Sequence, residues 1–135
     1  MSAELAVRGA VLAALKGDAA LMDRLNGLFE FAPARASPPY AVLGECLGSD
    51  WGAKDVEGRE LRLTISLHDA GETPGRLAPA MARIDPAVRS VADAGEGWRV
   101  VTARLVRSRV ARAGGREQSG WQAVMDYRLR AVREG

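Results

Sequence analysis

The stretch GRELRLTISLHD, residues 58–69, alternates between apolar and polar side chains in its second part. One side of the alternation holds four aliphatic residues, Leu61, Leu63, Ile65 and Leu67. The other side holds Arg62, Thr64, Ser66 and His68. A period of two is typical of a β-strand that buries one face. We therefore predict a strand over residues 59–68, whose single apolar face requires a second layer to cover it.

A polar segment, residues 49–58, leads into this strand. It carries one large aromatic side chain, Trp51, and four charged ones, Asp50, Lys54, Asp55 and Glu57. Gly52 and Gly58 interrupt it. We predict a ten-residue loop here, because glycines and charged residues in this density are typical of loops.

Two helices are expected before the first strand. Residues 3–16 combine apolar side chains with good helix formers, and Gly17 follows in a C-cap role. Asp18 can cap a second, short helix that contains Leu21, Met22 and Leu25. A proline-rich segment then excludes helix. Residues 40–47 are predicted to form the first strand, with Gly44 weakening it or marking a bulge.

The second half of the chain is predicted to form one helix and a long hairpin. Thr73 and Pro74 are expected as the N-cap and the first helical residue. A helical stripe follows, bent at Pro86, with apolar residues at Leu77, Met81, Ile84, Val88 and Val91. Residues 95–112 and 119–133 then flank a Gly-Gly turn. The alternation slips near Arg107, which predicts either a β-bulge there or a strand end that leaves the sheet.

Together these elements predict an α+β fold with an antiparallel four-stranded sheet. The sheet would consist of two hairpins with the helices packed on one face, in the order α-α-β-β-α-β-β. A chain of 135 residues that is 47% apolar can bury such a core as a single domain, residues 1–135.

The composition also limits compartment and partners. The lone cysteine, Cys46, cannot form an intramolecular disulfide. No apolar run approaches the roughly 18–20 residues of a membrane span, so we expect no membrane contact. Glu4 precedes the apolar part of the N-terminal helix, unlike in a signal peptide. We expect synthesis in a bacterial cytoplasm. The net charge of +2 is too small to indicate a basic surface by itself.

No residue pattern indicates catalysis, a cofactor or a metal, so we expect none of the three. His68 is the one histidine, and neither Ser66 nor Cys46 forms a recognisable catalytic arrangement with it. Asp50, Asp55 and Glu57 could supply oxygen ligands to calcium, but their irregular spacing around Lys54 favours a solvated loop.

An arginine-rich hairpin, residues 98–116, offers a different function. It contains Arg99, Arg104, Arg107, Arg109, Arg112 and Arg116, and Trp98 and Trp121 flank it. Arginines beside aromatic rings can bind single-stranded nucleic acid by charge and stacking. Arginine is also enriched in protein interfaces. A small nucleic-acid-binding or regulatory module therefore remains an alternative to an assembly protein.

Several segments of the sequence resemble a known protein family. These are the helix AVRGAVLAALKGDAAL, the approach PPYAVLGE, the segment DWGAKDVEGRE and the strand LRLTISLHD. They are similar to the tail completion, or tail terminator, proteins of long-tailed bacteriophages and of phage-derived gene transfer agents. The resemblance covers nearly the whole chain. Pro79 and Pro86 depart from the usual family pattern, in which this helix is smoother.

The resemblance implies a structural protein of a virion or gene transfer agent particle. In that family a homo-hexamer forms a ring that caps the tail tube, ends its polymerisation and joins the tail to the head-neck. The implied partners are the tail tube protein and the head-tail connector, or stopper, protein. DNA would pass through the lumen without specific binding.

On this basis we expect two groups of interface residues. Residues 49–58 are interpreted as an arm that reaches a neighbouring subunit or the tail tube, through Asp50, Trp51, Lys54, Asp55 and Glu57. A merely solvated loop is the alternative, although an exposed tryptophan usually has a partner. The second group lies on the arginine-rich hairpin and comprises Arg107, Arg109, Arg112 and Arg116.

Overall fold

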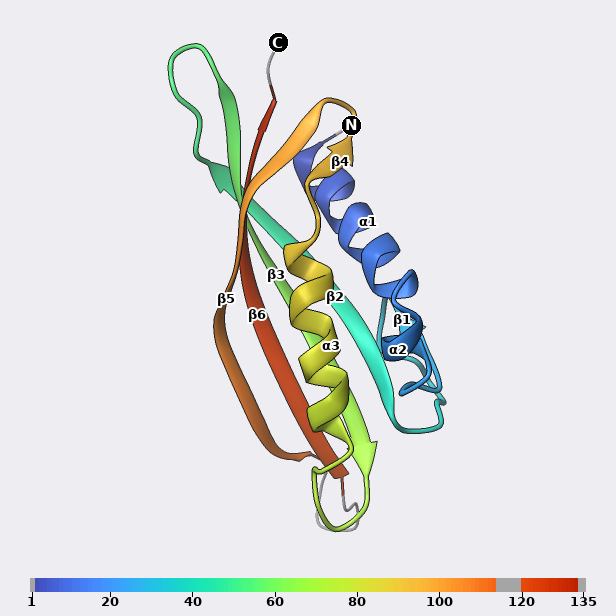
Figure 1. Cartoon of the computed structure of the whole chain (residues 1–135). Helices are drawn as coiled ribbons and strands as arrows, with labels where there is room; N and C mark the ends of the chain where they lie inside the picture. The colour runs from blue at the N-terminus through green and yellow to red at the C-terminus, as the bar shows by residue number, and fades with distance from the viewer. Residues whose placement is uncertain (1, 114–119, 134–135) are drawn as a thin grey trace.

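The computed structural model describes residues 2–113 and 120–133. Its elements are α1 (Ala3–Lys16), α2 (Ala19–Met22), β1 (Leu28–Phe29), β2 (Tyr40–Asp50), β3 (Glu57–Ala70), α3 (Leu77–Arg89), β4 (Asp93–Gly95), β5 (Trp98–Ala113) and β6 (Gly120–Arg133). Helices α1 and α3 lie against the same face of a long, twisted sheet (Figure 1). No helix of the described residues is long and apolar enough to cross a membrane.

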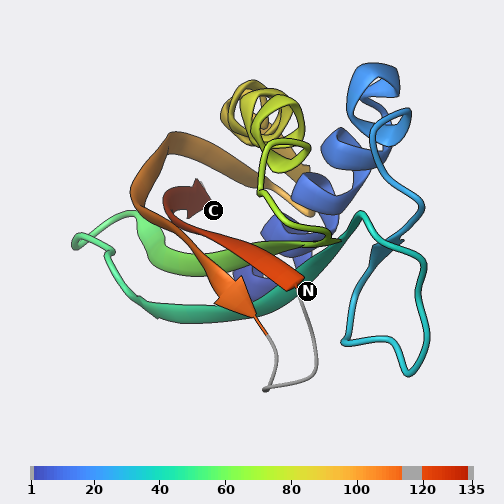
Figure 2. The ribbon, with the colours of Figure 1, turned by 90° about the horizontal axis from the view of Figure 1, so that it is seen from below.

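The sheet has six strands in the order β1-β2-β3-β6-β5-β4. It is mixed, because β1 pairs in parallel with β2 while the other neighbours are antiparallel. Seen from below, the sheet curls around the helices as a half-barrel (Figure 2). The predicted antiparallel four-stranded sheet is therefore wrong, and the order of elements is α-α-β-β-β-α-β-β-β.

The two strands that the prediction missed are short. β1 has two residues and β4 has three. A period of two cannot be recognised in so few residues, and both strands exist because a longer neighbour offers a free edge. β4 ends at Gly95 in a tight turn, in which Gly95 and Gly97 both have φ of 82°. Glycine adopts this conformation without steric cost, which permits the sharp reversal into β5.

The centre of the sheet is the antiparallel pair β3 and β6. Fourteen residue pairs join them, from Glu57 with Arg133 to Ala70 with Gly120. From Leu61 to Leu67 and from Ala123 to Ala131 the odd-numbered side chains lie in the core, and Leu61, Leu63, Ile65 and Leu67 are at most 1% exposed. Each such burial is worth about 1.5–3 kcal/mol. The predicted alternation is confirmed, and the strand extends beyond the predicted residues 59–68 at both ends.

The N-terminal predictions are confirmed apart from the length of the second helix. α1 buries Val7, Val11 and Leu15, and Gly17 forms its C-cap. The Asp18 side chain accepts a hydrogen bond of 2.9 Å from the Leu21 backbone amide and so caps α2. α2 ends after four residues, because the chain turns toward β1.

Helix α3 differs from the prediction at its start. It begins at Leu77 rather than at Pro74, and Arg76 occupies the N-cap position without a side-chain hydrogen bond that caps the helix. The carbonyl of Pro74 instead accepts from the Leu77 amide at 3.0 Å, so Thr73 and Pro74 belong to a preceding turn. Pro86 lies inside the helix, which continues to Arg89 as one element.

Irregular pairing occurs where the sequence indicated it. The register between β2 and β3 shifts between Leu43 and Cys46, which confirms a bulge at Gly44. The register of β5 shifts between Leu105 and Arg107, as expected. A second shift, between Val100 and Thr102, was not anticipated. Bulges increase the local twist of a strand, which suits a sheet that curls.

Buried polar contacts attach the helices to the sheet. The Tyr127 hydroxyl of β6 donates a 2.9 Å hydrogen bond to Asp85 of α3. On α1, the Arg8 guanidinium donates to the backbone carbonyls of Leu43 and Gly44, both at 2.9 Å. Arg8 therefore covers the bulged edge of β2, where carbonyl groups would otherwise need water.

The Tyr127 hydrogen bond generates a prediction for stability. Burial, and secondarily the bond to Asp85, raises the pKa of the phenol above its ordinary value. Because the pKa is raised in the folded state, the resulting stabilisation is fully present below the unfolded-state pKa of about 10. It is lost as the pH rises above that value. We expect Tyr127→Phe to cost about 1 kcal/mol of unfolding free energy at neutral pH. The variant should also lose less stability between neutral and alkaline pH than the wild type.

Urea denaturation at several pH values measures both effects. Tyr40→Phe is the matched control, because Tyr40 is the other tyrosine and its ring is only half-buried. An equal loss in the two variants would show that the Tyr127–Asp85 hydrogen bond contributes nothing specific.

Candidate interface surfaces

The segment that was predicted as a ten-residue loop is mostly a hairpin. β2 continues through Asp50 and β3 already begins at Glu57, so only residues 51–56 lie outside the strands. The Trp51 amide donates to the Gly58 carbonyl at 3.0 Å, and Ala53 and Val56 bond each other through their backbones. The loop prediction is wrong because backbone pairing with the partner strand outweighs the polar composition. We call residues 50–57 the hairpin tip.

The two glycines beside the hairpin tip are required by close backbone approach. A Cβ on Gly58 would lie 2.9 Å from the Trp51 carbonyl oxygen, and one on Gly52 would lie 2.8 Å from the Val56 carbonyl oxygen. Side chains cannot be accommodated at such distances from backbone atoms. These glycines therefore allow a narrow hairpin rather than a flexible loop.

Trp51 has a partner within its own chain. Its side chain is 38% exposed, and the Arg130 guanidinium lies over the ring at 5.1 Å from the centroid. This cation–π contact joins the base of the hairpin tip to β6. The tryptophan is thus neither core nor fully solvated, and part of its ring surface remains open to solvent.

The charged residues of the hairpin tip are all exposed. The Asp50 carboxylate accepts from the Gly52 amide at 3.2 Å. Glu57 forms an ion pair of 2.8 Å with Arg133 of β6. Lys54 and Asp55 lie at the turn, where the described residues provide them with no ion pair. Two uncompensated carboxylates, Asp50 and Asp55, therefore point into solvent beside a single lysine.

The arginines predicted on the second hairpin have different surroundings. Arg107 forms an ion pair of 3.0 Å with Asp126, which also accepts a 2.7 Å hydrogen bond from the Thr64 hydroxyl. The Thr64 bond and then Arg107 hold the pKa of the Asp126 carboxyl below its ordinary value. Arg112 lies over the Trp121 ring at 5.3 Å. Arg109 is exposed, and Arg116 lies outside the described residues.

The two predicted groups do not come together. The hairpin tip projects beyond one end of the sheet, whereas Arg107, Arg109 and Arg112 follow β5 toward the opposite end (Figure 1). A single copy of the chain therefore presents two separate surfaces.

The strand register also brings together arginines that the prediction did not connect. On the face of the sheet away from the helices, three rows cross β3, β6 and β5. The rows are Glu60–Arg130–Thr102, Arg62–Arg128–Arg104 and Thr64–Asp126–Arg107. We call these nine residues the arginine patch. It contains five arginines and two acids, and its middle row consists of arginine alone. Apart from Arg107, which follows the bulge, these residues occupy even-numbered positions of the strands, and the strand register places them side by side.

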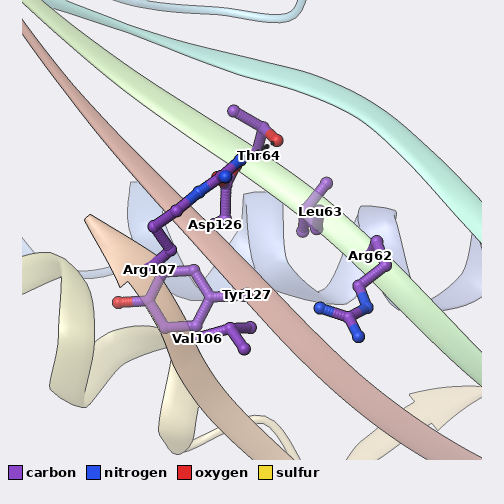
Figure 3. Close-up of a pocket in the computed structure, with 7 residues that line it drawn as sticks. All are labelled: Arg62, Leu63, Thr64, Val106, Arg107, Asp126 and Tyr127. Carbon is purple, nitrogen blue, oxygen red and sulfur yellow. Dashed lines mark hydrogen bonds and ion pairs between the residues drawn. The ribbon is translucent and has the colours of Figure 1, made fainter. Parts of the chain in front are cut away.

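A hollow of about 490 Å³ lies on this face beside the middle row. Arg62, Thr64, Val106, Arg107 and Asp126 line it, together with Leu63 and Tyr127. In Figure 3 the Arg107 side chain extends to Asp126 and Thr64, while Arg62 lies apart from that cluster. Val106 is 43% exposed because it is the additional residue of the bulge. The hollow thus combines arginine side chains with apolar ones, of which Val106 is exposed.

The remaining reactive side chains do not form a catalytic arrangement. The Ser66 hydroxyl and the His68 Nε2 are 2.9 Å apart, and the His68 ring is stacked on Tyr40 at 4.7 Å. Burial lowers the pKa of His68. Burial also raises the pKa of the Cys46 thiol to about 11, which makes it a poor nucleophile. Within residues 2–113 and 120–133, no three potential metal ligands come together.

Comparison with known proteins identifies relatives. Residues 9–131 match the family model described as tail completion protein gp17. No curated protein matches the chain. The fold is similar to that of a chain in the virion of a native gene transfer agent particle, with 20% identity, a TM-score of 0.75 and coverage of 93% of both chains. It is also similar to the bacteriophage SPP1 gp17 protein, with 18% identity, a TM-score of 0.58, and coverage of 94% of this chain and 89% of that chain.

The environment of Trp51 generates a second prediction. We expect Trp51→Ala to lower the unfolding free energy by about 1 kcal/mol, since the exposed cation–π contact with Arg130 is worth about 0.5–1 kcal/mol. A double-mutant cycle with Arg130→Ala should return a coupling energy of that size. Chemical denaturation of the four proteins measures it.

Trp98→Ala is the contrasting control. Trp98 is 2% exposed and belongs to the core, so its truncation should cost about 3–5 kcal/mol. If Trp51→Ala destabilises the chain as strongly as Trp98→Ala does, Trp51 is a core residue and not part of a surface.

Proposed function

The chain belongs to the tail completion protein family, and from that premise we propose its position and assembly state in the particle. The resemblance drawn from the sequence is thereby confirmed, and the protein is a structural component of a phage-like tail. We propose that it forms a homo-hexameric ring. The ring caps the tail tube, ends its polymerisation, and joins the tail to the head-tail connector, or stopper, protein.

The observation that carries this proposal is the extent of the likeness. The family match spans residues 9–131, and the fold agrees over 93% of a chain that is part of a gene transfer agent particle. The match thus includes both the hairpin tip and the strands of the arginine patch. A chain that matches the tail completion family over residues 9–131, and whose described residues hold no catalytic arrangement, is best explained as an assembly subunit.

An open sheet edge supports subunit contacts. β5 has sixteen residues, but β4 pairs with it only at Trp98 and Arg99. The outer edge of β5 beyond these residues has no strand neighbour in the described structure. Such an edge presents unpaired backbone groups and is usually covered in a functional assembly or protected by charges. Its exposed Val101, Val106 and Val110 fit an edge that contacts another protein.

The tryptophans weigh against the nucleic-acid module. Trp98 is buried beneath the Arg133 guanidinium, at 4.6 Å from the ring centroid. Trp121 lies on the core face beneath Arg112. Neither ring is free to stack on a base, which removes the aromatic part of single-strand binding at the arginine-rich hairpin. We propose that DNA passes through the ring without specific contacts.

Deletion of the gene tests the proposed role. We expect particles whose tails have irregular length or lack heads, visible by negative-stain electron microscopy. A reconstruction of the neck of wild-type particles should place this chain in one sixfold ring between tube and connector. A twelvefold position, or a position in the tail fibres, would contradict the proposal.

The hairpin tip generates a separate prediction in particles. We expect Trp51→Ala to give a folded subunit that fails in tail completion, because a tryptophan anchor can contribute about 2 kcal/mol or more to an interface. His68→Ala is the matched control, since it also removes a partly exposed aromatic ring and should leave particle production unchanged. Normal particles with Trp51→Ala would show that the tip is a solvated hairpin.

A further inference from the structure

We propose that the hairpin tip of one copy docks on the arginine patch of the next copy around the ring. This inference rests on the proposed ring and identifies which two surfaces form its subunit contact. The contact is heterologous, because two different surfaces meet. Repetition of such a contact gives a closed ring when the rotation between neighbouring copies divides a full turn evenly.

The first argument is the uncompensated charge of the patch. Arg62, Arg128 and Arg104 are direct cross-strand neighbours. Like charges directly opposite one another destabilise a sheet. Only Arg62 of these three has an ion pair among the described residues, a 3.4 Å contact with Glu60. The buried Nε of Arg128 has no hydrogen-bond partner in the described part of the chain. A carboxylate placed over this row would relieve the repulsion.

The second argument is that the chain carries a complementary element. The hairpin tip presents Asp50 and Asp55 without ion pairs to the described residues, and Trp51 and Val56 are exposed beside them. The patch provides arginines and the exposed Val106 next to a hollow of about 490 Å³. Acidic and apolar groups on one side therefore face basic and apolar groups on the other, which is the composition of a protein interface.

Within one copy Trp51 of the hairpin tip contacts Arg130 of the arginine patch, but the Asp55 carboxylate does not reach the middle row. Asp55 lies outside the sheet at the turn, seven positions along the chain from Arg62, and the intervening residues from Glu57 onward are fixed in β3 by pairing with β6. Strand residues rise about 3.3 Å each, so Asp55 stays well beyond reach of the middle row. A second copy is the nearest source of the carboxylates.

A second copy also explains the patch better than nucleic acid does. A phosphate backbone would need no apolar contact, yet Val106 is exposed in the hollow. The total charge of +2 is also small for a surface whose affinity comes from phosphate neutralisation. The composition of the arginine patch therefore fits a small acidic protein surface better than a continuous phosphate backbone.

Cross-linking in assembled particles tests the contact. The variant carries Asp55→Cys and Arg104→Cys and is treated with a short bis-maleimide. We expect a ladder of covalent oligomers up to six on a denaturing gel. The native Cys46 reacts slowly because burial raises its pKa to about 11. We expect no ladder from Asp55→Cys alone or from Arg104→Cys alone. We also expect none from Asp55→Cys combined with Lys16→Cys on α1.

Charge reversal provides an independent test. Arg104→Glu alone and Asp55→Arg alone should each lower incorporation of the chain into particles by about tenfold or more, and the two together should restore it. In the isolated chain, Arg104→Glu should raise the Tm, because it removes one like charge from the row. A merely structural role for Arg104 would lower stability and assembly together.

The outcomes separate this inference from the proposed function. If wild-type particles contain the sixfold ring but no ladder forms and the reversals have no effect, the docking is wrong and the ring stands. If the chain is absent from the neck, both proposals fail. If no ladder forms and Arg104→Glu lowers the affinity of the isolated chain for duplex DNA, the patch binds phosphate and the docking is overturned.

Discussion

The register between β3 and β6 is the constraint on which the rest of the structure depends. From Leu61 to Leu67 of β3 and from Ala123 to Ala131 of β6, odd-numbered side chains lie in the core and even-numbered ones lie on the outer face. Because side chains alternate with a period of two, a slip of one residue would bury Arg62 and Arg128 and expose Leu63 and Tyr127. Burial of an unpaired arginine costs far more than any surface contact can return. The hydrophobic effect therefore selects one register, and that register alone creates the row of arginines.

The two faces of the sheet then have different tasks. The inner face packs against α1 and α3 and is completed by specific polar contacts, such as Tyr127 with Asp85 and Arg8 with the carbonyls of β2. The outer face has no layer over it and carries charge instead. Bulges in β5 curve the sheet around the helices and place Val101 and Val106 on the exposed side. The half-barrel thus has a packed interior and an outer face on which some charged side chains have no ion pair among the described residues.

An exterior of this kind suits an assembly protein better than an enzyme. Function in such a subunit is distributed over surfaces that complement another chain, so its residues show no catalytic spacing and few perturbed pKa values. The net charge of +2 conceals the separation of a basic face from an acidic hairpin tip. Local charge imbalance, and not total charge, is what a neighbouring subunit would recognise. A fold alone does not specify this, since related folds can present different surfaces.

The sequence by itself determined the amphipathic elements and the family. Local residue chemistry predicts the alternation of residues 61–68, the Asp18 and Gly17 caps, and the bulges at Gly44 and Arg107. These features depend on neighbouring residues in the chain, so they can be inferred from the sequence. The short strands β1 and β4 were not predictable, because two or three residues acquire strand structure only when a neighbour supplies an edge. The hairpin tip was mistaken for a loop, since its polar composition hides backbone pairing across Gly52 and Gly58. The arginine patch combines residues up to 70 positions apart, from Glu60 to Arg130, so only the tertiary register could decide that they meet.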